Sequence, residues 1–443
     1  MSRFRCLFSL AVLGCVAPWM SCASAPPPES KEPSPRDADI RWFLDTAKQA
    51  AATIEDPMFR ECQYSFIVEA QAKAGDFSGA MKTAGLIKDL SWKASAYTDI
   101  AEAQAKAGDF SAAMKTAGLM GVAGRTYAYC RIAQAAAKAG NAAAANEASK
   151  SAQQAAGLIL FISDAFYSGE PTEGLRADIA AAQAWAGDLA GAERTAAAIR
   201  DANSRADAHR LIAEAQAGAG DYWGAMRRAA AIEVAWQKDY AYLGIGIPQV
   251  RAGDFERALR TADTCEEDYN KANLYARTAV AQARTGDFAS AMKTAAAIED
   301  VQVARRWKAW AYCSIAEAEI EAGNEESAKE TIELAKPPAA GVKDLGDRAL
   351  AYGQIATVQA EAHDLAGAMA TAGGIVYAPW RAWACCQIAE VEAKAEDSEA
   401  FKKAIDLARE AAATVTDAGM KDCAYRGIAQ TQVRCGEVEK VRA

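Results

Sequence analysis

A short motif recurs along the chain at nearly constant intervals and constrains its fold more than any other feature. The motif is a Gly-Asp pair that follows a run such as AEAQAKAG, and its glycine marks a corner in each repeat. The corners fall at Gly75, Gly108, Gly140, Gly187, Gly220, Gly253, Gly286 and Gly323, and in altered form at His363, Glu396 and Gly436. Five of the ten intervals are 33 residues, and the longer ones are 37, 40 and 47. The extra residues are close to whole helical turns, which predicts lengthened helices that keep the same buried face.

Fixed columns of residue types precede each corner. Tyr stands eleven residues before the corner in eight of the eleven repeats, and Ile stands eight before it in ten. Ala is usual seven residues before the corner, and Gln stands four before it in eight repeats. These offsets place the four columns on one stripe of a helix, which we expect to be buried. The buried Gln amides should form a hydrogen-bonded ladder with neighbouring backbone rather than bind a ligand.

A second helix is predicted after each corner. Asp or Asn follows the corner in ten of eleven repeats, where its side chain caps the free amides of a new helix. Ala stands five residues past the corner in nine repeats, which lets two helices lie close together. Each repeat is thus an antiparallel helical hairpin that must stack on its neighbours to bury its apolar stripe. We predict an all-α solenoid of about eleven hairpins over residues 39–443, with residues 39–54 as a cap.

These columns resemble a known repeat family. The residues that carry the resemblance, in order and spacing, are Tyr97, Ile100, Ala101, Gln104, Gly108, Asp109, Phe110, Ala113 and Ala117. They are similar to the tetratricopeptide pattern, and the match recurs over roughly residues 55–443. Gln and Ala replace two of the family's aromatic residues, and a closing proline is almost absent. The resemblance implies a right-handed superhelix whose concave groove holds a protein or peptide partner.

The resemblance also places certain polar residues in that groove. Glu recurs six residues before the corner and a basic residue two before it, in the favourable i, i+4 order, so a solvated helix face explains them as well. The candidate groove residues are Glu69, Lys73, Thr98, Glu102, Lys106, Glu214, Glu317, Glu390 and Lys394. An apolar insertion at 157–174 extends a second helix and either packs internally or docks a partner.

The first 25 residues have the layout of an export signal, with Arg3 and Arg5 before an apolar run from 6 to 20. Cys22 follows Ser21 and resembles a bacterial lipoprotein junction. The run Val12-Leu13-Gly14-Cys15 fits that pattern better but leaves a very short signal, and ordinary cleavage after Ala23 or Ala25 also competes. The Pro-rich residues 26–38 are interpreted as a polar tether. The protein is therefore expected to be exported, either to the bacterial cell envelope (periplasm or outer membrane) or as a secreted protein. Its membrane contact would be a lipid on Cys22.

Charge and motifs narrow the function further. The formal net charge of −9 argues against a nucleic-acid partner, because phosphate contacts need a basic surface. His209 and His363 are the two histidines, and no catalytic triad, HExxH pair or Gly-rich phosphate loop can be assembled. We therefore expect no catalytic residues, no metal and no cofactor, and a binding scaffold. An envelope spacer without a discrete ligand and an α/α-toroid hydrolase are the alternatives.

Overall fold

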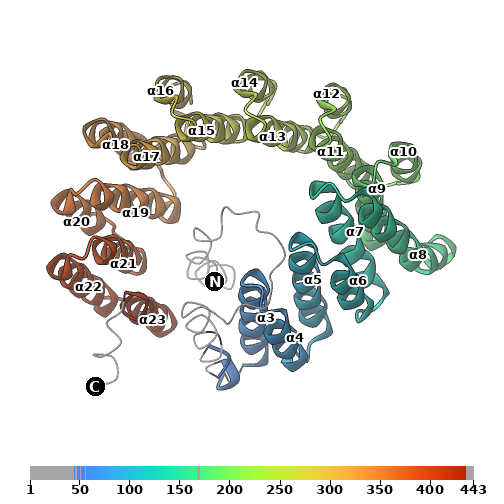
Figure 1. Ribbon diagram of the computed structural model, residues 1–443, viewed down its shortest axis with the longest axis horizontal. Coiled ribbons are helices and arrows are strands. Elements are labelled where there is room, and N and C mark those ends of the chain that lie inside the picture. Colours follow the sequence, from blue (N-terminus) through green and yellow to red (C-terminus); the bar gives the residue numbers. More distant parts are fainter. Residues whose placement is uncertain (1–43, 45–46, 50, 55, 167–169, 436–443) are drawn as a thin grey trace. The chain divides into compact units, whose positions relative to one another are not determined.

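A computed structural model describes residues 44–435 apart from 45–46, 50, 55 and 167–169. That part of the chain contains helices and connections but no strand (Figure 1). The signal at 1–25, Cys22 and the tether at 26–38 lie outside the described residues. None of the described helices combines the length and the apolar composition that crossing a bilayer requires.

Two kinds of helix alternate along the chain. The first helices of the hairpins are α3 (Pro57–Lys73), α5 (Leu90–Lys106), α7 (Val122–Lys138), α9 (Glu170–Trp185), α11 (Ala202–Gly218), α13 (Ala235–Arg251), α15 (Asp268–Arg284), α17 (Arg305–Glu321), α19 (Leu345–Glu361), α21 (Ala378–Lys394) and α23 (Ala418–Arg434). The second helices are α4 (Phe77–Leu86), α6 (Phe110–Gly118), α8 (Ala142–Phe166), α10 (Leu189–Ala197), α12 (Tyr222–Ala230), α14 (Phe255–Asp263), α16 (Phe288–Ala296), α18 (Glu325–Ala340), α20 (Leu365–Gly373) and α22 (Ser398–Ala413).

The corner of each hairpin has the conformation that its glycine permits. The eight corner glycines from Gly75 to Gly323 have φ between 74° and 87°, in the left-handed region. The Asp after the glycine caps the second helix; the Asp109 carboxylate, for example, accepts a hydrogen bond from the Ala112 amide at 2.9 Å. Both features were expected from the sequence. His363 and Glu396 adopt the same conformation, at φ 60° and 61°, although they carry side chains.

The predicted stripe forms the core. The Ile column is buried throughout, and Thr278, which replaces Ile in one repeat, is fully buried as well. Ala113 and Ala117 on α6 are also fully buried, which lets this second helix lie against its neighbours. Tyr64, Tyr242 and Tyr312 are buried, in agreement with a core role, whereas Tyr425 in the last repeat is 41% exposed.

The chain divides into two compact units, residues 1–237 and 238–443, and the boundary falls inside α13. In unit 1 the first helices α3, α5, α7, α9 and α11 pack side by side in that order, and in unit 2 α15, α17, α19, α21 and α23 do the same (Figure 1). Second helices such as α6 and α18 contact the first helix before them and the first helix after them. At the start of unit 1, Leu44 and Ala51 are buried against α3 residues such as Tyr64, as expected for a capping segment. The hairpins thus stack as a solenoid within each unit.

Most length variation lies in the second helices, and a lengthened second helix was predicted for the interval of 47 residues. Seven second helices contain nine or ten residues, whereas α8 has 25 and α18 and α22 have 16 each. The interval of 37 residues is an exception, because α16 keeps nine residues and the extra ones lie in the connection 297–304. The prediction of a lengthened helix was wrong there. The side chains of 158–172 lie outside the described residues, so the role of the 157–174 insertion stays a prediction.

The Gln column forms hydrogen bonds, but not to the backbone as expected. The side-chain oxygen of Gln282 accepts a bond from the Thr294 hydroxyl at 2.8 Å, twelve residues along on the second helix. The same bond recurs at 2.6 to 2.8 Å at Gln104–Thr116, Gln183–Thr195, Gln249–Thr261 and Gln359–Thr371. The column therefore joins the two helices of one hairpin, and the expectation of backbone partners is corrected.

Candidate functional site

Charged and polar side chains gather on the first helices of unit 1. We call this set the charged face, and its members are Glu69, Lys73, Asp99, Glu102, Lys106, Tyr127, Arg131, Asp178, Asp207, Arg210 and Glu214. They come from α3, α5, α7, α9 and α11, which pack side by side in that order. The buried columns fix these helices, so the face is a row of polar side chains on a packed support.

Most charges on this face are paired within it. Lys73 contacts Glu69 at 2.6 Å, and Lys106 contacts Glu102 at 2.7 Å, so two of the predicted i, i+4 pairs form. Arg131 on α7 donates two hydrogen bonds to Glu102 on α5, at 2.9 and 3.0 Å. This bidentate contact ties neighbouring hairpins together.

Opposing effects set the protonation of Glu102. Its burial opposes ionisation, but the hydrogen bond from Lys106 and the charge of Arg131 outweigh it. The pKa of the Glu102 carboxyl is therefore below its usual value, so this group stays ionised and paired. The pairing leaves less of its charge available to a ligand.

Two carboxylates of the charged face behave differently. Burial raises the pKa of Asp99 to about 6, and the nearby Glu69 and Glu102 add to the shift. Burial also raises the pKa of Asp178 to about 6, with a contribution from Asp207. Among the described residues, no side chain or amide forms a hydrogen bond or ion pair with either carboxylate.

The remaining candidate groove residues occupy several environments. Glu214 lies 3.8 Å from Arg210, which also contacts Asp207 at 2.6 Å. Glu390, in unit 2, accepts a hydrogen bond from the Thr431 hydroxyl at 3.1 Å. Thr98 is 7% exposed and its hydroxyl donates to the Ala94 carbonyl at 2.9 Å, so this side chain belongs to the helix packing.

In unit 2 a group of acidic side chains lies near Glu317. Burial raises the pKa of Glu317 to about 7, and Glu361 adds to the shift while Arg284 opposes it. Burial also raises the pKa of Glu361, against the opposing charge of Lys394. Two predicted groove residues, Glu317 and Lys394, therefore both lie near the carboxylate of Glu361.

Sequence reasoning missed Asp99, Tyr127, Arg131 and Asp178. It looked for columns that repeat, and these residues stand nine and thirteen positions before the corner, where the residue type changes from repeat to repeat. That variation on an otherwise repetitive helix was the available signal. Structural columns repeat because every hairpin needs them, whereas a ligand is contacted by individual repeats.

A basic column fifteen residues before the corner was also missed. It contains Lys or Arg in ten of eleven repeats. Arg60 donates to the Ile54 carbonyl at 3.0 Å, and Lys308 donates to the Ile298 carbonyl at 2.6 Å. These side chains occupy the free carbonyls of the preceding connection, so the column is structural.

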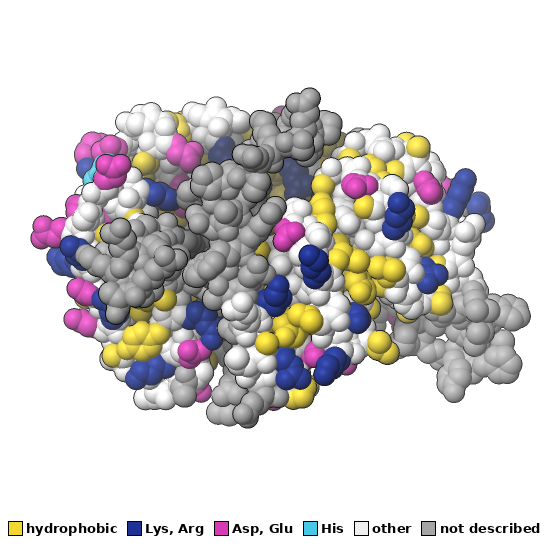
Figure 2. All heavy atoms as spheres, turned by 60° about the horizontal axis from the view of Figure 1, so that its bottom comes forward, with side chains coloured by type: hydrophobic (Ala, Val, Ile, Leu, Met, Phe, Trp, Pro, Cys, Tyr) yellow, Lys and Arg dark blue, Asp and Glu magenta, His cyan; other side chains and the backbone are white. Residues whose placement is uncertain are grey.

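Large apolar side chains are exposed elsewhere on both units. Met58 is 70% exposed and Leu90 is 81% exposed, each in the first turn of a first helix. Figure 2 shows one face of the molecule, on which hydrophobic side chains form patches between scattered charged ones. These patches are a second kind of accessible surface.

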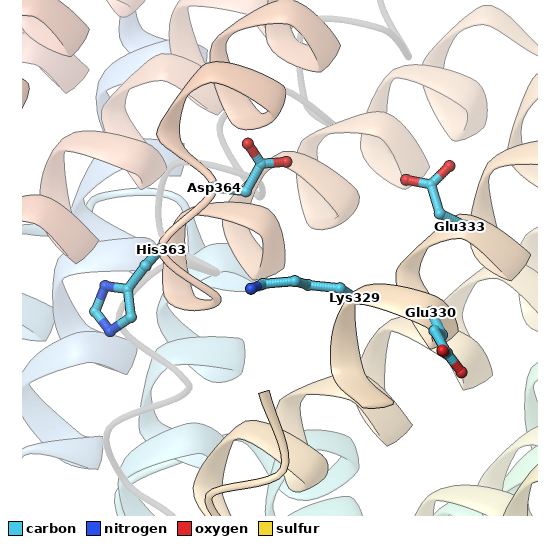
Figure 3. Close-up of a pocket in the computed structure, with 5 residues that line it drawn as sticks. All are labelled: Lys329, Glu330, Glu333, His363 and Asp364. Atoms are coloured by element: carbon cyan, nitrogen blue, oxygen red, sulfur yellow. The ribbon is translucent and has the colours of Figure 1, made fainter. Parts of the chain in front are cut away.

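An open hollow of about 510 Å³ lies between α18 and the corner before α20. Its lining residues are Lys329, Glu330, Glu333, His363 and Asp364. Figure 3 shows Lys329 reaching toward the corner that carries His363 and Asp364, while Glu330 and Glu333 stand along α18. Lys329 is already paired with Glu326 at 2.8 Å. The hollow therefore does not combine a nucleophile with an oriented base.

Cysteines and metal-binding side chains complete the survey of the described residues. Six of their eight cysteines are buried, as expected for packed thiols. The described residues hold no group of three or more His, Cys, Asp or Glu placed to bind a metal ion. His209 contacts Arg228, with 3.4 Å between its Nδ1 and the guanidinium, and burial together with this charge lowers the pKa of the imidazole.

The repeating geometry decides the kind of fold. The chain is an all-α array of stacked helical hairpins, the fold expected from its resemblance to the tetratricopeptide pattern. Three similar solved structures are Ton1535 from Thermococcus onnurineus, yeast Tom70 and the TPR domain of P58(IPK). Ton1535 is 18% identical, with 88% of this chain and 98% of that chain covered and a TM-score of 0.26. Tom70 is 14% identical, with coverages of 90% and 93% and a TM-score of 0.32. The P58(IPK) domain is 16% identical, with coverages of 89% and 99% and a TM-score of 0.22.

Because these TM-scores are low, the fold is assigned from the helical hairpins of this chain and not from the similar structures. A scan against protein-family models found no match. A search of the curated proteins found no match either.

Proposed function

We propose that this protein is a non-enzymatic scaffold that binds a segment of a partner protein, or a peptide, along the charged face of unit 1. The observation that carries the proposal is the contrast between repeating and varying positions on the first helices. The Ile column is buried in every described repeat, whereas Asp99, Tyr127 and Asp178 vary between repeats and are half-buried or exposed. A constant framework that presents variable side chains suits recognition of an extended partner.

Affinity capture from an envelope extract tests this function. The bait is the protein without residues 1–25, and the variant carries Glu69→Lys and Glu214→Lys, which reverse charge at two ends of the charged face. Glu147→Lys, an exposed position on the second helix α8, is the matched control. We expect a discrete partner with the wild type and the control and its loss with the variant. Capture of the same proteins by all three baits would favour a spacer without a discrete ligand.

We also propose that the protein is exported and anchored through a lipid on Cys22. The support is the signal-like layout of residues 1–25 and the polar tether at 26–38. Radiolabelled fatty acid should label the wild type but not Cys22→Ser. Absence of label from both proteins, together with release of the wild type in soluble form, would replace the anchor by ordinary secretion.

A further inference from the structure

We propose that the charged face of unit 1 selects an extended segment with two basic residues six positions apart, one held at Asp99 and the other at Asp178. This inference rests on the proposed function and adds the chemistry of the partner. It follows from the charge balance of the face, from the aromatic residue between the two carboxylates and from the spacing of the helices.

Two carboxylates of the charged face form no ion pair with any described residue. Glu69 is paired with Lys73, and Glu102 is shared by Lys106 and Arg131. Arg210 serves both Asp207 and Glu214, at 2.6 and 3.8 Å. After these pairs are counted, Asp99 and Asp178 are the carboxylates of the charged face that have no ion pair within the described residues. The face is therefore complementary to two added positive charges.

The surroundings of both groups favour a cationic partner over water. Asp99 faces the charges of Glu69, Glu102, Lys73 and Arg131, and the two carboxylates raise its pKa in addition to burial. Asp178 faces Asp207, Arg131 and Arg210, and again burial and the neighbouring carboxylate raise the pKa. An ammonium or guanidinium group would reverse these shifts, because an opposite charge stabilises the ionised form.

An aromatic side chain lies between the two carboxylates. Tyr127 is on α7, the helix between α5 and α9, and it is 43% exposed. Burial is the main reason why the pKa of its phenol is raised, and the charges of Asp178 and Asp99 both contribute. Tyr127 is therefore near both carboxylates. Its ring offers a surface for the aliphatic stem or the charged head of a basic side chain.

The helix spacing sets the distance between the two basic residues. Packed helices lie about 8 to 10 Å apart, so α5 and α9, with α7 between them, are separated by roughly 16 to 20 Å. An extended chain advances about 3.3 Å per residue, and alternate side chains point to opposite faces. Residues i and i+6 therefore span about 20 Å on one face, whereas i and i+5 point to opposite faces.

Two isomeric peptides test the spacing by fluorescence anisotropy on the full chain at pH 7.5. Both are nine-residue Ser/Thr/Gly peptides with two arginines, at positions 2 and 8 in one and at positions 2 and 7 in the other. We expect the first to bind at least about fivefold more tightly, and Asp99→Asn and Asp178→Asn each to weaken it about tenfold. Glu147→Gln, which removes one exposed carboxylate from α8, should leave binding unchanged.

The outcomes separate this inference from the proposed function. Equal binding of the two isomers, or unaltered binding to both Asp variants, overturns the inference. An immobilised mixture of acidic, apolar and basic peptides can then be screened. If one of these peptides binds the wild type and not the variant with Glu69→Lys and Glu214→Lys, the proposed function stands although the inference fails. If no peptide of any class is retained, both fail. Circular dichroism of each variant at pH 7.5 checks that a loss of binding does not come from unfolding.

Discussion

At the scale of single residues, the corners show what the repeat demands of the backbone. Glu396 holds a left-handed conformation at φ 61° that glycine adopts at eight other corners. A side chain in this region costs about 1 kcal/mol, so we expect Glu396→Gly to stabilise the fold by about that amount. The measurement is the midpoint of urea unfolding, followed by circular dichroism.

The matched control is the reverse change at an equivalent corner. Gly286 has φ 84°, and an added Cβ would meet no atom within 4 Å. Gly286→Ala should therefore lose about 1 kcal/mol through conformation alone. Equal midpoints for wild type, Glu396→Gly and Gly286→Ala would show that the corner conformation carries no strain.

The Gln–Thr contact is the second prediction at this scale. Gln282→Leu leaves the hydroxyl of Thr294, which is 6% exposed, without its partner, so we expect a loss of about 1 to 2 kcal/mol. Adding Thr294→Val removes the unpaired hydroxyl and should recover about half of that loss. A double-mutant cycle measured by urea unfolding gives the coupling. A coupling of zero would mean that the contact does not stabilise the hairpin.

The protonation of Asp99 and Asp178 predicts how stability changes with pH. Both pKa values are about 6 in the folded protein, above the ordinary aspartate value of 3.8, so the folded state binds protons more tightly than the unfolded state does. Stability from these groups is therefore fully present below pH about 4, falls as the pH rises to about 6 and is constant above. Asp99→Asn and Asp178→Asn should raise the melting temperature at pH 7.5, by an amount that shrinks toward pH 4.

Thermal melts between pH 4 and 8 provide that measurement, with Glu147→Gln as the control. If the two Asp variants melt below the wild type at pH 7.5, their carboxylates stabilise the fold when ionised, contrary to this argument. Asp variants that melt at a higher temperature than the wild type are folded. A loss of peptide binding by these variants would therefore be a direct effect on the site.

At the scale of elements, α18 shows a helix that continues through two prolines. Pro337 and Pro338 lie inside α18, which ends at Ala340, and Pro337 is exposed whereas Pro338 is buried. Each proline removes a helical hydrogen bond. Pro337→Ala restores one bond without disturbing the core, so we expect a gain of about 1 to 2 kcal/mol in urea unfolding. Lys336→Ala, one position earlier, is the control, and an unchanged or lower midpoint for Pro337→Ala would contradict the prediction.

The elements also show what the sequence could predict. The helices and their buried stripe could be predicted from the Tyr, Ile and Ala columns, and the capped corners from the Gly-Asp pair. These patterns repeat because each hairpin meets the same packing constraints. The partner of the Gln column was missed because the helix carrying Thr294 comes alongside Gln282 only in the folded hairpin. Likewise, nothing local distinguishes the extra turns in α18 from the extra residues in the connection 297–304.

The candidate site was predicted less completely than the fold. The pairing of Glu69 with Lys73 and of Glu102 with Lys106 could be predicted because i, i+4 neighbours are visible within one helix. Asp99, Tyr127 and Asp178 belong to three neighbouring helices, so their proximity depends on stacking that no single helix reveals. Thr98 was placed in the groove although its hydroxyl is used by its own helix.

At the scale of the whole molecule, the hairpins depend on one another for stability. In unit 2, one hydrophobic cluster runs from Ala272 to Ala362 through α15, α16, α17, α18 and α19. Second helices such as α16 have only nine residues, and helices this short are marginal alone in water. Burial between neighbouring hairpins must therefore supply most of the stability, at about 25 cal/mol for each Å² of apolar surface.

A truncation series tests this dependence. A fragment of residues 268–303 contains the single hairpin α15–α16, and residues 268–373 contain the three hairpins from α15 to α20. We expect the single hairpin to show little helical circular dichroism and no cooperative melt. The three-hairpin fragment should fold and melt below the full chain, because it retains two of the stacking interfaces and the cluster they share. A single hairpin that melts with the full chain would mean that each repeat is stable alone, and the helical packing that positions the charged face would then need another origin.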